Sequence, residues 1–130
     1  MGGHVAEKLF IGADQVTSGC GSDFAHATSL AQRAVRHFGM FGEEAGYLAG
    51  KKEDQSNEHN ALVDKTVKQI LDESYDRVVA LLSGKERELR MLATGLFKYD
   101  YLNKEEIDTI LKGKKLEKPT VREAAKEFVF

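Results

Sequence analysis

The longest regular pattern in the chain runs from residue 60 to residue 82 and favours a fold built from helices. Largely apolar side chains recur there every three or four residues, which is the spacing of one face of an α-helix. The stripe consists of Leu62, Val63, Thr66, Val67, Ile70, Leu71, Tyr75, Val78, Val79 and Leu82. Such a stripe is ordinarily the side of a helix that faces the protein core.

Similar but shorter patterns predict further helices on both sides of this stretch. Ser83 and Gly84 form a short break before the next pattern, which predicts an antiparallel helical hairpin. The fold class is therefore all-α, a bundle of about five to six helices that includes this hairpin. The expected helices cover residues 3–10, 22–38, 60–82, 85–99, 104–112 and 121–128.

Three details refine these helices. Asn103 with Glu106, and Thr120 with Glu123, have the spacing of capping boxes at two helix starts. Gly95 lies inside an expected helix, where it costs stability relative to alanine, so a close helix contact is expected there. The side chains expected to face inward on that helix are Leu89, Leu92, Ala93, Leu96 and Phe97.

Composition limits what the chain does. The 130 residues fit one domain with a real core, and 42% hydrophobic with 31% charged residues is typical of a globular protein. A net charge of −2 argues against a nucleic-acid partner. A single cysteine excludes an internal disulfide. No P-loop is present, so ATP cannot bind by that route.

Between residues 40 and 58 the helical pattern fails, and glycines with a run of charged residues predict a surface loop. His59, at the end of this loop, is expected to be solvated.

A second notable stretch, residues 16–28, is a polar, glycine-rich loop that leads into a helix. Gly19 and Gly21 can adopt positive φ angles. Ser22 or Asp23 can cap the helix through a side-chain oxygen. The simplest interpretation of the Asp23 carboxylate is that it serves as a helix cap and has no further role.

Short motifs in a fixed order place this loop in a wider context. They are Met1-Gly2-Gly3, Ala6-Glu7, Thr17-Ser18-Gly19, Asp23, Ala27-Thr28, Ala31, Phe38-Gly39-Met40, Leu96 to Leu102 and Gly113 to Leu116. In this order and spacing the chain resembles the peptidase region of FtsH-type AAA zinc proteases, and most of all the mitochondrial i-AAA branch. One departure is Gln32, which stands where the family pattern has arginine. The resemblance covers residues 1–116, as the C-terminal portion of the peptidase domain, and leaves 117–130 as a tail with a short helix.

The resemblance implies a zinc centre to which this chain contributes one ligand. In the family, two histidines of a His-Glu-x-x-His helix and an aspartate from a loop-to-helix junction hold the zinc, and Asp23 matches that aspartate. Thr17, Ser18, Gly19, Gly21 and Ser22 then support the metal-binding loop. The His-Glu-x-x-His motif is absent from these 130 residues. The chain alone is therefore expected to be inactive and free of zinc, with no catalytic residue of its own.

The resemblance further implies a part of an ATP-dependent zinc metalloendopeptidase that degrades membrane-associated or unfolded proteins. ATP would bind a domain outside this chain, and an upstream segment would anchor the enzyme in the membrane. The assembly would be a hexamer in the mitochondrial inner membrane, facing the intermembrane space. The alternative is a non-catalytic helical assembly module of a truncated or inactive homologue. For the ending Phe128-Val129-Phe130, docking on a neighbouring subunit, folding back and disorder all stay open.

Overall fold

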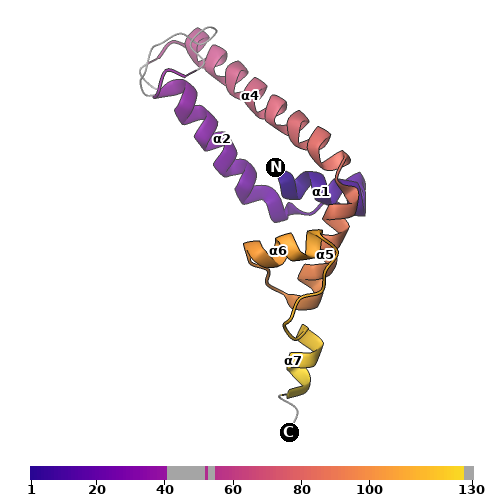
Figure 1. Cartoon of the computed structure of the whole chain (residues 1–130). Helices are drawn as coiled ribbons and strands as arrows, with labels where there is room; N and C mark the ends of the chain where they lie inside the picture. Colours follow the sequence, from indigo (N-terminus) through magenta and orange to yellow (C-terminus); the bar gives the residue numbers. More distant parts are fainter. Residues whose placement is uncertain (41–51, 53–54, 128–130) are drawn as a thin grey trace. The chain divides into compact units, whose positions relative to one another are not determined.

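A computed structural model describes residues 1–40, 52 and 55–127 of the chain (Figure 1). Within these ranges it contains six α-helices and no strand, which confirms the all-α class. Two short 3₁₀ helices, η1 and η2, precede the second α-helix. The elements are α1 (Gly2–Ile11), η1 (Ala13–Gln15), η2 (Ser18–Cys20), α2 (Gly21–Arg36), α4 (Asn57–Ser83), α5 (Glu86–Tyr99), α6 (Lys104–Leu111) and α7 (Val121–Glu127). Among the described residues, none of these helices is both long enough and apolar enough to span a membrane.

The observed helices follow the expected ones closely, except at the start of α4. This helix begins at Asn57, three residues before the expected start, so it includes His59. The expectation that His59 is solvated is wrong, because its side chain is half-buried and its Nε2 has no hydrogen-bond partner among the described residues. The loop expected before α4 lies mostly outside the described residues, and so does the ending 128–130.

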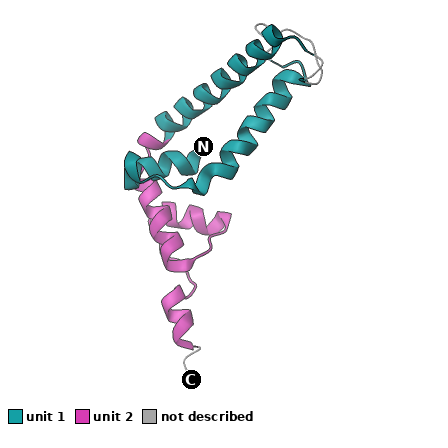
Figure 2. Cartoon of the chain, turned by 180° about the vertical axis from the view of Figure 1, so that it is seen from behind, with its two compact units in different colours: residues 1–81 teal, residues 82–130 magenta. Residues whose placement is uncertain are grey.

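The chain divides into two compact units, residues 1–81 and residues 82–130 (Figure 2). The hairpin expected from residues 60–82 and 85–99 spans this division, and it stays a prediction. An antiparallel helix pair is nevertheless present inside the first unit, where α2 and α4 run in opposite directions (Figure 1).

The core of the first unit lies between α2 and α4. Ala31 and Val35 of α2 pack with Val63 and Val67 of α4, and all four are buried. Near one end of the pair, the buried Arg36 guanidinium of α2 donates hydrogen bonds of 2.6 Å to Gln55 Oε1 and to Asn60 Oδ1. These bonds join the end of α2 to the start of α4.

In the second unit, α5 and α6 approach each other at Gly95, which is buried. A Cβ atom at this position would lie 2.6 Å from Ile110 Cδ1 and 3.3 Å from Leu102 Cδ1. The glycine expected to permit a close helix contact therefore does so. The prediction that Ala93, Leu96 and Phe97 face inward is wrong, because Ala93 is exposed and the other two are 48% and 83% exposed. Since α6 packs on the Gly95 side of α5, the two residues that follow are turned outward.

Both expected capping boxes are confirmed. Glu106 N donates to Asn103 Oδ1 at 2.9 Å, and Asn103 N donates to Glu106 Oε1 at 3.2 Å. Thr120 N donates to Glu123 Oε2 at 2.8 Å, and Glu123 N donates to Thr120 Oγ1 at 3.3 Å. Glu106 also forms an ion pair with Lys118. The ammonium group of Lys118, followed by the capping bond from Asn103, lowers the pKa of Glu106.

Candidate metal-ligand site

Asp23 lies in the first turn of α2, as its third residue. Its side chain is exposed, and within the described residues its carboxylate makes no hydrogen bond or ion pair. The N-terminal end of a helix carries a partial positive charge, which stabilises a carboxylate at this position. The Asp23 carboxylate is thus accessible and has no bonding partner among the described residues. The helix fixes its backbone.

The helix start itself differs from the expectation. Neither Ser22 nor Asp23 is the cap, because both lie inside α2, whose N-cap residue is Cys20 and has no side-chain cap bond. The loop winds as the 3₁₀ helix η2 directly into α2, and Gly21 N donates to Ser18 O. Backbone hydrogen bonds of this kind satisfy part of the free N–H groups at the helix start, which a capping side chain would otherwise satisfy.

The two loop glycines do not use their conformational freedom. Gly21 has a φ of −58°, and Gly19 is not among the residues with positive φ. The described glycines that do adopt positive φ are Gly12, Gly39 and Gly113, each just after a helix. Glycine at positions 19 and 21 permits positive φ, but the loop is helical through both residues and does not need it.

Glu7 of α1 holds the beginning of the loop. Its Oε1 accepts a hydrogen bond of 2.8 Å from Thr17 N, ten residues further along the chain. Thr17 Oγ1 in turn accepts from Gly19 N at 3.3 Å and caps η2. The bonds from Thr17, with a smaller contribution from the charge of His4, lower the pKa of Glu7. The Glu7 carboxylate therefore ties α1 to the loop that leads to Asp23.

A second contact fixes the end of the loop on α1. A Cβ atom at Gly3 would lie 3.2 Å from Cys20 Sγ, so glycine there lets the N-cap residue of α2 approach α1 closely. Next to it, the His4 ring meets the Phe24 ring edge-on, with centroids 5.1 Å apart. Asp23 is thus flanked in sequence by two residues, Cys20 and Phe24, that pack against α1.

The fit of this site to zinc can be tested on its donor atoms. A catalytic zinc takes three protein ligands and keeps one open position for water. The described residues contain no group of three His, Cys, Asp or Glu side chains that could hold a metal ion. Asp23 can serve as a single carboxylate ligand, because it is exposed and has no hydrogen bond or ion pair with any described residue. A three-ligand zinc site that used Asp23 would therefore need two further ligands from outside the described residues.

Comparison with known proteins shows which family the chain belongs to. Residues 1–110 match the family model of Peptidase family M41. The chain belongs to this family. The expectation of an FtsH-type peptidase fragment, drawn from the short motifs, is thereby confirmed.

Three relatives illustrate the match. The mitochondrial inner membrane i-AAA protease supercomplex subunit YME1 of Saccharomyces cerevisiae is 41% identical over 120 residues, which are 91% of this chain and 16% of that protein. The ATP-dependent zinc metalloprotease YME1L1 of Mus musculus is 39% identical over 118 residues, 90% of this chain and 16% of that protein. FTSH 11, a chloroplastic/mitochondrial ATP-dependent zinc metalloprotease of Arabidopsis thaliana, is 41% identical over 111 residues, 85% of this chain and 14% of that protein. The chain thus spans only about a sixth of the length of these relatives.

Sequence reasoning missed the residues that position the loop. Gly3 and Glu7 both belong to motifs quoted for the family resemblance, yet the role of each becomes visible only in the contact with Cys20 or Thr17. The two residues of each contact, Glu7 with Thr17 and Gly3 with Cys20, are ten or more positions apart, and no local pattern encodes such a contact.

Proposed function

We propose that the chain is the C-terminal part of the peptidase domain of an ATP-dependent zinc metalloendopeptidase, with residues 1–116 as the peptidase portion and 117–130 as a tail. The observation that carries the proposal is the Asp23 carboxylate, which is exposed on the first turn of α2 and has no partner among the described residues. By the resemblance, it stands where the family motif has its zinc-ligating aspartate. Membership of Peptidase family M41 supports it.

Asp23 would be the third zinc ligand, beside two histidines from outside this chain. The metal, when bound, lowers the pKa of a coordinated water from 15.7 to about 7 and so supplies a nucleophile for peptide hydrolysis. The chain's own residues have the task of holding the carboxylate in place. Glu7 and Gly3 anchor the two ends of the loop on α1, and α2 fixes the backbone of Asp23. Ser18, Gly19, Gly21 and Ser22 supply the helical path between them.

The chain alone would be inactive, because one carboxylate does not hold a catalytic zinc. ATP would bind a domain outside the chain, because relatives such as YME1L1 and FTSH 11 are named as ATP-dependent proteases. The whole enzyme would be a homo-hexamer that degrades membrane-associated or unfolded polypeptides. By its likeness to YME1, it would belong to the mitochondrial inner membrane, on the intermembrane-space side.

The test is proteolysis by a longer version of the protein that includes the family's His-Glu-x-x-His segment. We expect ATP-dependent cleavage of an unfolded model substrate by the unaltered enzyme, and loss of cleavage in Asp23→Asn. Asp14→Asn is the matched control, because Asp14 is also an exposed aspartate close to the loop but lies in η1. Full activity of Asp23→Asn would overturn the proposed role of this residue. A longer protein that lacks an intact His-Glu-x-x-His would instead favour the non-catalytic assembly module.

A further inference from the structure

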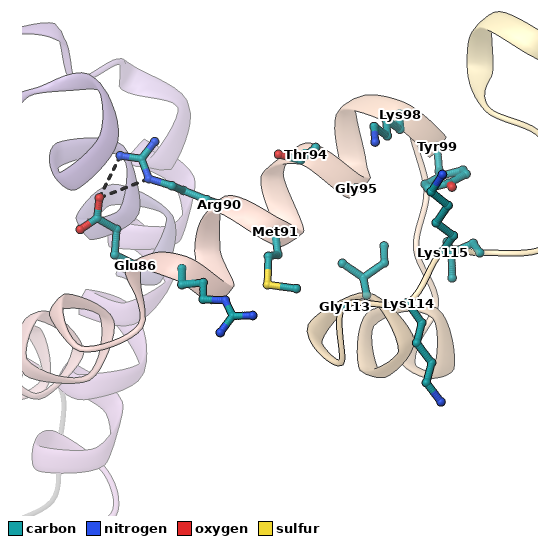
Figure 3. A pocket seen from close by; sticks show the side chains of 13 residues that line it. Glu86, Arg90, Met91, Thr94, Gly95, Lys98, Tyr99, Gly113, Lys114 and Lys115 are labelled. Atoms are coloured by element: carbon teal, nitrogen blue, oxygen red, sulfur yellow. Dashed lines mark hydrogen bonds and ion pairs between the residues drawn. The ribbon is translucent and has the colours of Figure 1, made fainter.

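The second unit carries a hollow between α5 and the segment that follows α6 (Figure 3). Its volume is about 710 Å³, within the range of about 300 to 1,000 Å³ that is typical of ligand sites. Its apolar lining comes from the side chains or backbone of Met91, Gly95, Ile110 and Leu116. Figure 3 shows Met91 pointing from α5 toward the space between the helices.

Cationic side chains lie at both ends of this hollow. Arg87 and Arg90 lie in the first turns of α5, whereas Lys98 lies in its last turn beside Lys115 of the following segment. Arg90 donates to Glu86 Oε1 at 2.8 and 3.2 Å, which neutralises the acidic residue of the lining. Arg87, Lys98 and Lys115 are exposed and form no ion pair with any residue of the described ranges. The hollow therefore combines an apolar lining with unneutralised positive ends.

The hollow is elongated along α5. Its lining includes residues 87, 91, 94 and 98, which recur at helical spacing on one face. The eleven steps from residue 87 to residue 98 correspond to about 16 Å at 1.5 Å per step. A compact anion such as phosphate would meet only one end of such a surface, whereas a peptide segment would reach both.

A neighbouring hollow of about 820 Å³ continues the surface toward α7. The two share Lys98, Tyr99, Lys115 and Leu116 as lining residues. The second hollow adds Phe97, whose side chain is 83% exposed, and Arg122. A contiguous apolar surface rimmed by polar residues is typical of an interaction site, and Phe97 extends the apolar lining of this one. In the combined lining, seven residues are cationic and two are acidic.

We propose that this surface, called here the α5 groove, is a docking site for an acidic peptide segment with apolar side chains. The partner's apolar side chains would cover Met91, Leu116 and Phe97, and its carboxylates would face Arg87 at one end and Lys98 with Lys115 at the other. Charge complementarity carries the choice of partner, because the groove is basic although the whole chain has a net charge of −2. Nucleic acid suits it less well, since its phosphates would leave the apolar lining uncovered. The inference does not depend on the role proposed for Asp23.

The experiment uses the whole 130-residue chain and fluorescence anisotropy of a labelled peptide with leucines on one face and glutamates on the other. Two matched peptides replace the glutamates by glutamines, or the leucines by serines. We expect binding of the first peptide that weakens as salt is added, and about ten-fold weaker binding of each matched peptide. Equal binding of the glutamine peptide, or no binding of the acidic peptide, would overturn the proposal.

Variants of the chain locate the binding. Arg87→Glu, Lys98→Glu and Lys115→Glu combined should weaken peptide binding at least about ten-fold. The control combines Lys65→Glu, Lys104→Glu and Lys112→Glu, which changes the net charge equally at exposed positions outside the groove. It should leave binding within about two-fold. A neutral variant, with glutamine at the three groove positions, should give an intermediate loss, and circular dichroism should show unchanged helix content in all three.

Two other possible ligands of the groove, nucleic acid and an anionic membrane, are tested in separate competition titrations. A single-stranded oligonucleotide and vesicles containing an anionic lipid are added to the preformed peptide complex. Displacement of the peptide at a lower concentration than unlabelled peptide requires would overturn the choice of an acidic peptide, as would a control variant that loses as much binding as the groove variant. Failure to displace would support it.

Discussion

The close approach of α5 and α6 at Gly95 predicts how Gly95→Ala changes the stability of the second unit. The sign of that change depends on the Cδ1 methyl group of Ile110. A Cβ atom at this position would lie 2.6 Å from Ile110 Cδ1, well inside van der Waals contact. Gly95→Ala gains about 1 kcal/mol of helix propensity and loses about 1 to 3 kcal/mol by overpacking. We therefore expect the single variant to be neutral to about 2 kcal/mol less stable. Ile110→Val alone should cost about 0.5 to 1.5 kcal/mol.

The double variant separates the two effects. Valine at position 110 lacks the Cδ1 methyl, so Gly95→Ala in that background should keep its propensity gain and stabilise the unit by up to about 1 kcal/mol. The coupling energy between the two substitutions should therefore be about 1 to 3 kcal/mol and favourable. As a control, Ile107→Val on the same helix should be additive with Gly95→Ala, because Ile107 is not among the atoms near the added Cβ.

The assay is native-state hydrogen exchange of the α5 and α6 amides, which reports the opening free energy of the second unit. A single unfolding transition of the whole chain would be less suitable, because the chain has two compact units. Additivity of Gly95→Ala and Ile110→Val within about 0.5 kcal/mol would refute the packing of α6 on Gly95.

Two further predictions concern polar contacts. Asn60→Ala removes one of the two acceptors that the buried Arg36 guanidinium has among the described residues, and it should destabilise the first unit by about 1.5 to 3 kcal/mol. Asn57→Ala, at an exposed position, should stay within about 0.5 kcal/mol. Native-state hydrogen exchange of the α2 and α4 amides measures both variants, and equal effects would contradict the contact. The folded-state pKa of Glu106 is lowered, so its stabilisation is complete above the ordinary glutamate pKa of about 4.3 and is lost as the pH falls through the lowered value. Glu106→Gln should reduce this acid sensitivity of α6 amide protection and Glu105→Gln should not; unchanged acid sensitivity in Glu106→Gln would contradict the ion pair.

Much of the fold could be predicted because local patterns encode it. Apolar spacing places the helices within a few residues, and the Asn103 and Thr120 boxes form as their spacing indicates. These features depend on residues three or four apart, so a single sequence is sufficient to find them.

Features that depend on distant partners could not be predicted in the same way. Phe97 faces outward because α6 crosses α5 on the Gly95 side, and nothing within residues 85–99 specifies where α6 will pack. The local sequence offers Ser22 or Asp23 as the cap of α2, but the preceding residues continue the helical path and move its start upstream.

The same distinction between local patterns and distant contacts applies to the candidate site. Asp23 was identified from the order of short motifs, whereas its anchoring through Glu7 and Gly3 required the coordinates. The α5 groove brings Arg87 and Lys115 onto one surface although 28 positions separate them, and neither residue stands out in the sequence. Long-range juxtaposition is therefore what the structure adds.

The most direct test of the central claim is the zinc content of a longer version of the protein that carries the His-Glu-x-x-His segment. Metal analysis of the purified protein should find about one zinc per chain, as a site with three protein ligands holds one ion. Asp23→Asn should reduce zinc affinity strongly, and Asp14→Asn should not. Full zinc content with unchanged affinity in Asp23→Asn would show that the third ligand lies elsewhere and would contradict the account.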